Sequence, residues 1–173
     1  RDSCAVAYRI GRLTFQKGDA TLPANYRPIS LLPAGCKVLA RMLQQRLKNG
    51  GVEGRLRSTQ YGFRPNRSTT QALAVARRAI DAANAAGGQS VIALLLDWAK
   101  AFDRLKVDTM LHALGRFGLP SACLQIIGSI YGAQFFALTD SCQDSTQRRQ
   151  RAGIAQGCPL SSYLFIIVQS VLP

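Results

Sequence analysis

The amino-acid sequence predicts an α+β fold, and three observations lead to this prediction. Stretches with a helical periodicity of apolar residues are interspersed with short extended stretches, without the strict alternation that is typical of parallel α/β sheets. Hydrophobic residues make up 47% of the chain and recur along its length, which argues against a disordered or low-complexity protein. The 173 residues leave room for one ordinary domain, or for two lobes that share a core.

The first third of the chain is expected to hold two extended segments and one helix. Residues 6–13 can be extended before a turn at 17–19, and residues 26–30 must be extended just before Pro28, where helix is disfavoured. A helix is expected from Cys36 to Lys48, with its apolar face formed by Val38, Leu39, Met42, Leu43 and Leu47. Two glycines at 50–51 end this helix. The arginine-rich residues 55–67 are expected to form an ordered loop.

The middle of the chain predicts a buried strand between two helices. Ser68 is a good N-cap for a helix whose apolar face holds Leu73, Ala76, Ile80 and Ala83, and the glycines at 87–88 stop it. Residues 91–96 form a continuous aliphatic run, typical of a strand that is buried on both faces. This run ends abruptly in Asp97. Asp108 opens the next amphipathic helix, which Gly118 and Pro120 close, with His112 on its solvated side.

The last third predicts a helix, a hairpin and a second helix. Residues 122–131 have the composition of a helix, and residues 134–139 can pair with residues 147–152 as a hairpin. Residues 153–159 are too rich in turn residues for a helix or a strand. An apolar helix is expected to begin near Ser161.

The charge of the chain indicates a polyanionic partner. The sequence holds 22 Lys and Arg against 9 Asp and Glu, which gives a net charge of +13 and a pI near 10.3. Such an excess attracts nucleic acid above other partners, although a solvated basic surface is the alternative. Five arginines in polar segments are the expected contacts with RNA or an RNA–DNA duplex: Arg64, Arg67, Arg148, Arg149 and Arg151.

Cysteine usage and hydropathy predict a soluble intracellular protein. The five cysteines are scattered and form no C-x-x-C pair, which argues against a disulfide framework, and the single histidine argues against a structural zinc site. No apolar run approaches the roughly 20 residues that span a bilayer. No contact with a membrane is therefore expected.

Asp97 is the position with the clearest chemical interpretation. A carboxylate at the exit of a buried strand is costly to desolvate unless a cation pairs with it, and oxygen ligands of this kind suit Mg²⁺. The alternative is a helix N-cap for the short turn at residues 98–102. Taken alone, Phe102 would be a core residue, Asp103 a cap or surface carboxylate, and Gln156-Gly157 a simple turn.

Five segments together resemble the reverse transcriptases of non-LTR retrotransposons. Asp97-Trp98-Ala99-Lys100-Ala101-Phe102-Asp103 resembles the first catalytic box of that family, and residues 153–165 (GIAQGCPLSSYLF) resemble its second palm box. Residues 16–19 and 25–31 resemble its fingers boxes, and residues 60–64 with 67–69 resemble another box. The five occur in the family's order. One departure is Ser162, which stands where many relatives have a proline.

The resemblance implies a role for each matching residue. Asp97 would bind both Mg²⁺ ions of a two-metal phosphoryl transfer, with Mn²⁺ as an alternative, and the backbone carbonyl of Trp98 would help to hold one ion. Lys17 and Arg27 would contact the triphosphate. Phe102 would be the steric gate against the ribose 2′-hydroxyl. The remaining residues expected beside the nucleotide are Ala101, Gln156 and Gly157.

The resemblance also implies a right-hand polymerase fold, with a fingers region at residues 1–88 and a partial palm at residues 89–173. The thumb, the last palm hairpin and its Asp-Asp box are not found in the sequence, so the chain alone is expected to be inactive. The implied partners are an RNA template, a DNA primer, deoxynucleoside triphosphates and the rest of a retrotransposon polyprotein. The implied location is the nucleus, with the cytoplasm as the alternative.

Three alternatives stay open at this stage. A decayed retroelement copy or a basic RNA-binding module without catalysis would carry the same boxes, and so would a group II intron-type maturase. A viral-type RNA polymerase is disfavoured, because that class usually has a carboxylate five residues after the first aspartate, where this sequence has Phe102.

Overall fold

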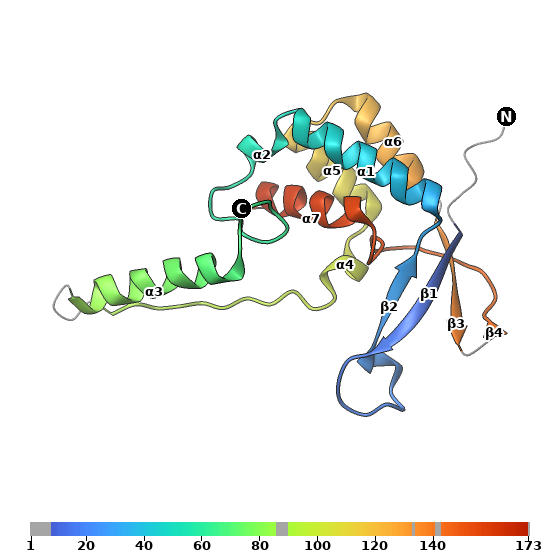
Figure 1. Cartoon of the computed structure of the whole chain (residues 1–173), viewed down its shortest axis with the longest axis horizontal. Helices are drawn as coiled ribbons and strands as arrows, with labels where there is room; N and C mark the ends of the chain where they lie inside the picture. Colours follow the sequence, from blue (N-terminus) through green and yellow to red (C-terminus); the bar gives the residue numbers. More distant parts are fainter. Residues whose placement is uncertain (1–7, 86–89, 133, 141–142, 173) are drawn as a thin grey trace.

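The computed structural model describes residues 8–85, 90–132, 134–140 and 143–172. A layer of packed helices covers one end of a small sheet, and an arm projects from the opposite side of the body (Figure 1). This mixture of helices and a mixed sheet confirms the α+β prediction.

The sheet combines segments that are far apart in the sequence. Its strands are β1 (Tyr8–Phe15), β2 (Tyr26–Leu31), β3 (Phe135–Asp140), β4 (Gln143–Asp144) and β5 (Arg148–Arg149). The order is β2-β1-β3-β4, with β5 also paired to β3. β1 is antiparallel to β2 and parallel to β3, so the predicted extended segments and the predicted hairpin lie in one sheet. Pro28 lies in the edge strand β2, where a missing N–H is tolerated.

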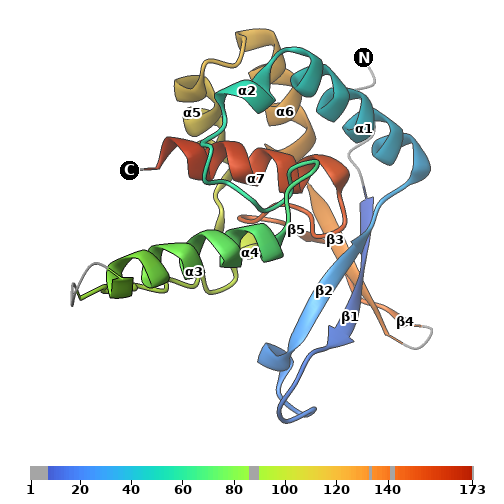
Figure 2. The same ribbon diagram turned by 60° about the vertical axis from the view of Figure 1, so that its left-hand side comes forward.

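The helices are α1 (Ala34–Asn49), α2 (Val52–Arg55), α3 (Thr69–Ala85), α4 (Ala101–Arg104), α5 (Val107–Phe117), α6 (Ser121–Gly132) and α7 (Pro159–Val171), with a 3₁₀ turn, η1, at Pro23–Asn25. Helix α7 packs against both α1 and α5, and α6 packs against α5 (Figure 2). The core therefore lies around α7, whose buried residues are Leu160, Ser161, Tyr163, Leu164, Ile166, Ile167 and Val168.

The buried face of α1 differs from the predicted face. Of the five apolar residues assigned to it, only Leu43 and Leu47 are buried, whereas Val38, Leu39 and Met42 are exposed. The buried stripe runs instead through Ala40, Leu43 and Leu47, and the helix packs against α7. The apolar pattern alone did not reveal which side of the helix a neighbour covers.

The predicted strand at residues 91–96 is wrong. The segment is extended but pairs with no described strand, and its side chains are exposed, with Ile92 at 94% and Leu95 at 90%. A strand buried on both faces needs a neighbour at each edge and cover on each side, because its backbone N–H and C=O groups must be paired. The described sheet lies elsewhere and supplies neither a neighbouring strand nor a covering layer. The aliphatic run therefore has the composition of a strand but no strand to pair with.

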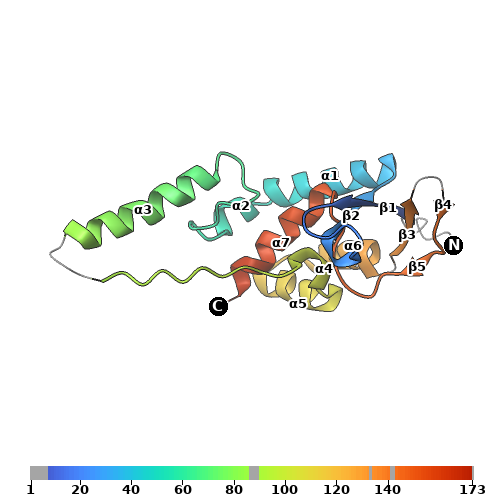
Figure 3. The same cartoon turned by 90° about the horizontal axis from the view of Figure 1, so that it is seen from below.

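Helix α3 and the extended residues 90–97 form the projecting arm (Figures 1 and 3). Helix α3 begins as predicted: the Ser68 hydroxyl accepts a hydrogen bond from the N–H of Gln71, whose side chain accepts one from the N–H of Ser68. Helix α3 has no buried residue in its described range. The glycines predicted to stop it lie outside the described residues. Of the helices that the structure describes, none is long and apolar enough to cross a membrane.

Candidate functional site

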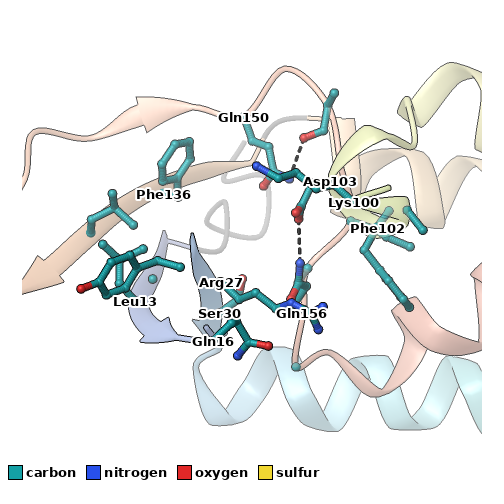
Figure 4. A pocket seen from close by; sticks show the side chains of 18 of the residues that line it. Leu13, Gln16, Arg27, Ser30, Lys100, Phe102, Asp103, Phe136, Gln150 and Gln156 are labelled. Carbon is teal, nitrogen blue, oxygen red and sulfur yellow. Dashed lines mark hydrogen bonds between the residues drawn. The ribbon is translucent and has the colours of Figure 1, made fainter. Parts of the chain in front are cut away.

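A cleft of about 1160 Å³ opens where the sheet meets the helices. Its walls come from the β1–β2 hairpin, from residues 98–103 around the start of α4, and from residues 150–157 before α7. Figure 4 shows side chains from these three segments facing one another across the cleft. The three walls are separated by more than forty residues of sequence each, so the fold alone brings them together.

All six residues that were expected beside a nucleotide line this cleft. They are Lys17, Arg27, Ala101, Phe102, Gln156 and Gly157. Trp98 lines it as well, and so does Ser162, the residue that departs from the family pattern. The structure brings these residues to one place; their individual roles stay predictions.

The β1–β2 hairpin presents the two basic residues. Arg27 lies in β2 opposite Thr14, and the turn at the end of the hairpin closes with a 3.0 Å hydrogen bond from the N–H of Gln16 to the carbonyl of Asn25. Asp19 orders the turn, because its carboxylate accepts hydrogen bonds from both the hydroxyl and the N–H of Thr21. These bonds stabilise the ionised form and hold the pKa of Asp19 below its ordinary value. Lys17 is exposed on this turn.

The hairpin is joined to the segment before α7 at one point. The N–H of Ser30 donates a 2.9 Å hydrogen bond to the carbonyl of Gln156. Gly157 follows with φ of +104°, and a Cβ there would lie 3.0 Å from the carbonyl oxygen of Ser30. Only glycine suits this position, because the backbone is left-handed and another backbone crosses it closely. The glycine of the second box is thus explained by packing.

A second joint connects α4 to the same segment. The Gly153 and Ile154 N–H groups donate hydrogen bonds of 2.8 and 2.9 Å to the carbonyls of Leu105 and Phe102. Gly153 has φ of +92°, and a Cβ there would lie 2.8 Å from the carbonyl oxygen of Asp103. The two boxes that resemble the palm motifs are therefore fixed to each other through their backbones.

Asp103 is a site residue that the sequence interpretation missed. It is half-buried, and its carboxylate accepts a 2.8 Å hydrogen bond from the side-chain amide of Gln156 (Figure 4). The sequence indicated only a cap or a surface carboxylate, because nothing in the local pattern shows that residues 103 and 156 meet. The one available signal was its place directly after Phe102 in the first box.

Phe102 is packed on two sides and still lines the cleft. Its ring stacks on Phe165 of α7, with 4.8 Å between centroids and 22° between planes. Phe63 meets the other side at 6.1 Å and 86°. Phe63 itself is 59% exposed, lines the cleft and has a left-handed backbone with φ of +58°, which is unfavourable for an aromatic residue. Neither the contact nor the conformation of Phe63 was predicted.

Asp97 does not line this cleft. It is exposed at the base of the arm and lines a smaller neighbouring cavity of about 460 Å³, together with Phe165 and Gln169. Trp98 lines both spaces. The alternative, a helix N-cap at Asp97, is wrong, because the N-cap of α4 is Lys100, which has φ of +54°. Asp97 is displaced from its predicted setting for the same reason that residues 91–96 are not a strand.

The described residues do not by themselves fit a two-metal site. No group of three or more His, Cys, Asp or Glu side chains comes together anywhere in the described ranges. Asp97 offers one carboxylate, and Asp103, which lines the larger cleft, already accepts a hydrogen bond from Gln156. Mg²⁺ takes six oxygen ligands in near-octahedral geometry, and two ions would have to share the one carboxylate of Asp97, with water in the other positions.

The arginines that were expected to bind nucleic acid fall into two groups. Arg64 is an internal residue of its loop: it pairs with the Glu53 carboxylate at 3.2 Å and donates to the carbonyls of Arg57 and Glu53. Its expected contact with nucleic acid is disfavoured, because most of its donors are already used. The other four, Arg67, Arg148, Arg149 and Arg151, are exposed.

Comparisons with known proteins point to one family. A family model described as reverse transcriptase (RNA-dependent DNA polymerase) matches residues 15–173. The RNA-directed DNA polymerase from mobile element jockey of Drosophila funebris is 30% identical over 155 residues, which cover 86% of this chain and 16% of the relative. The probable RNA-directed DNA polymerase from transposon BS of Drosophila melanogaster is 28% identical over 153 residues, 87% of this chain and 17% of the relative.

A third relative, the transposon TX1 uncharacterized 149 kDa protein of Xenopus laevis, is 27% identical over 150 residues, which are 87% of this chain and 11% of the relative. The chain thus spans less than a fifth of the length of each of these relatives.

Proposed function

Because this chain belongs to the reverse transcriptase family, we propose that its cleft binds the incoming deoxynucleoside triphosphate during RNA-directed DNA synthesis. The family is the one that the five sequence boxes predicted, and its members are RNA-directed DNA polymerases. The observation that carries the proposal is the convergence of three separate boxes on one cleft.

The charges around the cleft support this assignment. Lys17 and Arg27 lie on the hairpin wall and Lys100 on the α4 wall, so three cations face a space that is large enough for a nucleotide. A triphosphate carries several negative charges, and fixed cations in a partly enclosed site bind such a group and stabilise the charge that develops during transfer. We assign the triphosphate to the side of Lys17 and Arg27.

Phe102 is proposed as the wall that the sugar meets. Its ring is held between Phe63 and Phe165, so it cannot easily move away from a ribose 2′-hydroxyl. The competing role is packing alone, which the same two contacts would also serve. The affinities for deoxyribonucleotides and ribonucleotides separate the two roles, because substitution of Phe102 changes the ratio of these affinities only if the residue is a gate.

The metal chemistry is proposed in outline. Enzymes of this family use divalent metal ions, and Asp97 is the proposed carboxylate contribution of this chain to two Mg²⁺ ions, with the backbone carbonyl of Trp98 as a further ligand. Such ions supply activation of the primer hydroxyl and neutralisation of the leaving pyrophosphate when bound. The remaining carboxylates would come from an Asp-Asp box, so we expect no primer extension by residues 1–173 alone.

The division into lobes is part of the same proposal. Residues 1–88 would form fingers and residues 89–173 part of a palm in a right-hand fold, with α7 and α5 at its centre. Strand β1 pairs with β3, so one sheet joins the two regions. The exposed Arg67, Arg148, Arg149 and Arg151 are proposed contacts for RNA template and DNA primer.

Titration of the chain with a deoxynucleoside triphosphate in the presence of Mg²⁺ tests the function. We expect Arg27→Ala to weaken binding by about tenfold, as for a hydrogen-bonded charge contact. Arg78→Ala, which removes an exposed arginine of α3 far from the cleft, should leave affinity unchanged. Phe102→Val should reduce the preference for deoxyribonucleotide over ribonucleotide. The measurement is the dissociation constant, obtained from NMR chemical shifts.

A second candidate function is a basic module that only binds RNA. The net charge of +13 favours it independently of the cleft. Such a protein would bind RNA in a salt-sensitive way but would show no nucleotide binding that depends on Arg27. Equal affinities for the wild type, Arg27→Ala and Arg78→Ala would support this candidate over the polymerase.

A further inference from the structure

We infer that Asp103 is a positioning residue that fixes the orientation of the Gln156 side chain, so that this point of the cleft presents the amide oxygen to the bound nucleotide. The identity of the ligand rests on the proposed function; the orientation of the amide rests on the structure alone. Asp103 has no part in the polymerase mechanism proposed for the cleft.

The chemistry of the pair determines which end of the amide faces Asp103. An ionised carboxylate only accepts hydrogen bonds, so the group within 2.8 Å of its Oδ1 must be the Nε2 of Gln156 and not its oxygen. Rotation of the amide by half a turn would place two acceptors in contact. The orientation therefore follows from the charge of Asp103, without reference to how the two ends of the amide are assigned.

Both residues are held in place by their backbones. Asp103 lies in α4, where its N–H donates to the carbonyl of Lys100, and its own carbonyl lies against Gly153. The backbone of Gln156 is held from the other side by the N–H of Ser30. The backbone of each residue is therefore anchored, and the hydrogen bond between the two side chains restricts rotation of the Gln156 amide.

The result is an acceptor that is directed toward the ligand. Gln156 lines the cleft, and no hydrogen bond from any described residue to its Oε1 occurs. A group that donates a hydrogen bond, such as a sugar hydroxyl or a base N–H, would be favoured there. A phosphate oxygen would be disfavoured, which is consistent with placing the triphosphate near Lys17 and Arg27 instead.

A structural tie between the two boxes is the competing explanation for the same bond. A tie would matter for stability, whereas a positioning residue would matter for nucleotide affinity and only through Gln156. The two explanations differ in a double-mutant cycle, because a residue that acts through another has no further effect once that other residue is removed.

Nucleotide titration of the 173-residue chain and five variants tests the inference. We expect Asp103→Ala and Gln156→Ala each to weaken binding of a deoxynucleoside triphosphate by about tenfold, and the double variant to be no weaker than either. Asp103→Asn should recover part of the loss, because its side-chain oxygen can still accept from Nε2. Asp108→Asn, a matched change in the exposed first turn of α5, should bind like the wild type.

The Gln156 side-chain amide supplies a readout that does not depend on nucleotide. In the wild type its ¹⁵N-attached protons should be shifted by the carboxylate and protected from exchange, and both effects should disappear in Asp103→Ala but persist in Asp108→Asn. Identical amide signals in the wild type and Asp103→Ala would overturn the inference. So would additive losses of affinity in the cycle.

The failure of the proposed function is distinguishable from the failure of this inference. If Arg27→Ala weakens nucleotide binding while Asp103→Ala does not, the cleft binds nucleotide and the Asp103–Gln156 hydrogen bond only connects the two boxes. If Arg27→Ala and the wild type bind equally, the assignment of the cleft falls. In that case the amide signals still decide whether Asp103 orients Gln156.

Discussion

Helices α7 and α3 were both predicted from the sequence and reach opposite outcomes. Helix α7 is apolar along most of its length and buries seven residues, whereas α3 carries a narrower apolar stripe and none of its described residues is buried. Leu164 is fully buried in α7, and Leu73 is 70% exposed in α3. The comparison teaches that an apolar stripe predicts a helix and its inward face, but not whether a partner for that face is present.

The surroundings of the two helices differ in the same way. In the body, α5 and α1 cover α7 from two sides, and the segments of the cleft are attached to that core. In the arm, no described helix or strand covers both α3 and the aliphatic residues 91–96. Four of these residues are more than 75% exposed: Ile92, Leu94, Leu95 and Leu96. Asp97 lies at the base of this arm, so the residue with the clearest predicted chemistry is in the least packed region.

Paired leucine truncations give the largest expected effect. Leu164→Ala removes a fully buried side chain from α7, and we expect a loss of about 2 to 5 kcal/mol in the free energy of unfolding. Leu73→Ala removes the same atoms from the exposed face of α3 and should change it by less than about 0.5 kcal/mol. Urea unfolding followed by circular dichroism measures both. Similar losses in the two variants would mean that α3 is packed in solution.

Alkaline pH should act on the body through Tyr163 of α7. Burial and then the negative charge of Glu53 raise the pKa of this phenol above its ordinary value of 10.0. The unfolded chain therefore loses this proton at a lower pH than the folded protein does. Stability from this group is complete below about pH 10 and falls above it, by at most about 1.4 kcal/mol per pH unit.

Tyr163→Phe isolates that effect from the titration of other groups. The difference in unfolding free energy between wild type and variant should be constant from pH 7 to 9 and should shift in favour of the variant above about pH 10. Denaturant midpoints at a series of pH values measure it. A difference that stays constant up to pH 11 would mean that the phenol is solvated in the folded protein.

Local patterns predicted most of the elements of the fold. The N-cap Ser68, the glycines after α1 and the extended residues just before Pro28 depend on neighbours within a few residues, so the sequence contains the whole of their physical cause. The strand at residues 91–96 was wrong because its partner is a matter of tertiary structure. The shifted face of α1 has the same origin, since α7 selects the side that is buried.

The candidate site was predicted through the family boxes and not through local chemistry. Six expected nucleotide residues line one cleft, although nothing in the spacing of Lys17, Phe102 and Gln156 requires them to meet. Asp103 and Phe63 were missed because their importance lies in contacts with distant residues. Arg64 was expected to be free to bind nucleic acid, but its guanidinium pairs with the carboxylate of Glu53, eleven residues earlier.

The smallest expected effect tests whether the arm is energetically separate from the body. Ser68→Ala removes the hydroxyl that accepts the Gln71 N–H and should cost α3 about 1 kcal/mol of local helix stability. Because α3 buries nothing in its described range, this loss should not reach the core: the urea midpoint should stay within error of the wild type. Amide hydrogen exchange in residues 69–85 should become several times faster, while exchange in α7 stays constant. Thr109→Ala, an exposed change in the body's α5, is the matched control and should leave exchange in α3 unaltered. A lower urea midpoint in Ser68→Ala, with faster exchange in α7, would show that the arm and the core unfold as one unit. The two regions would then differ in the exposure of their side chains but not in their stability.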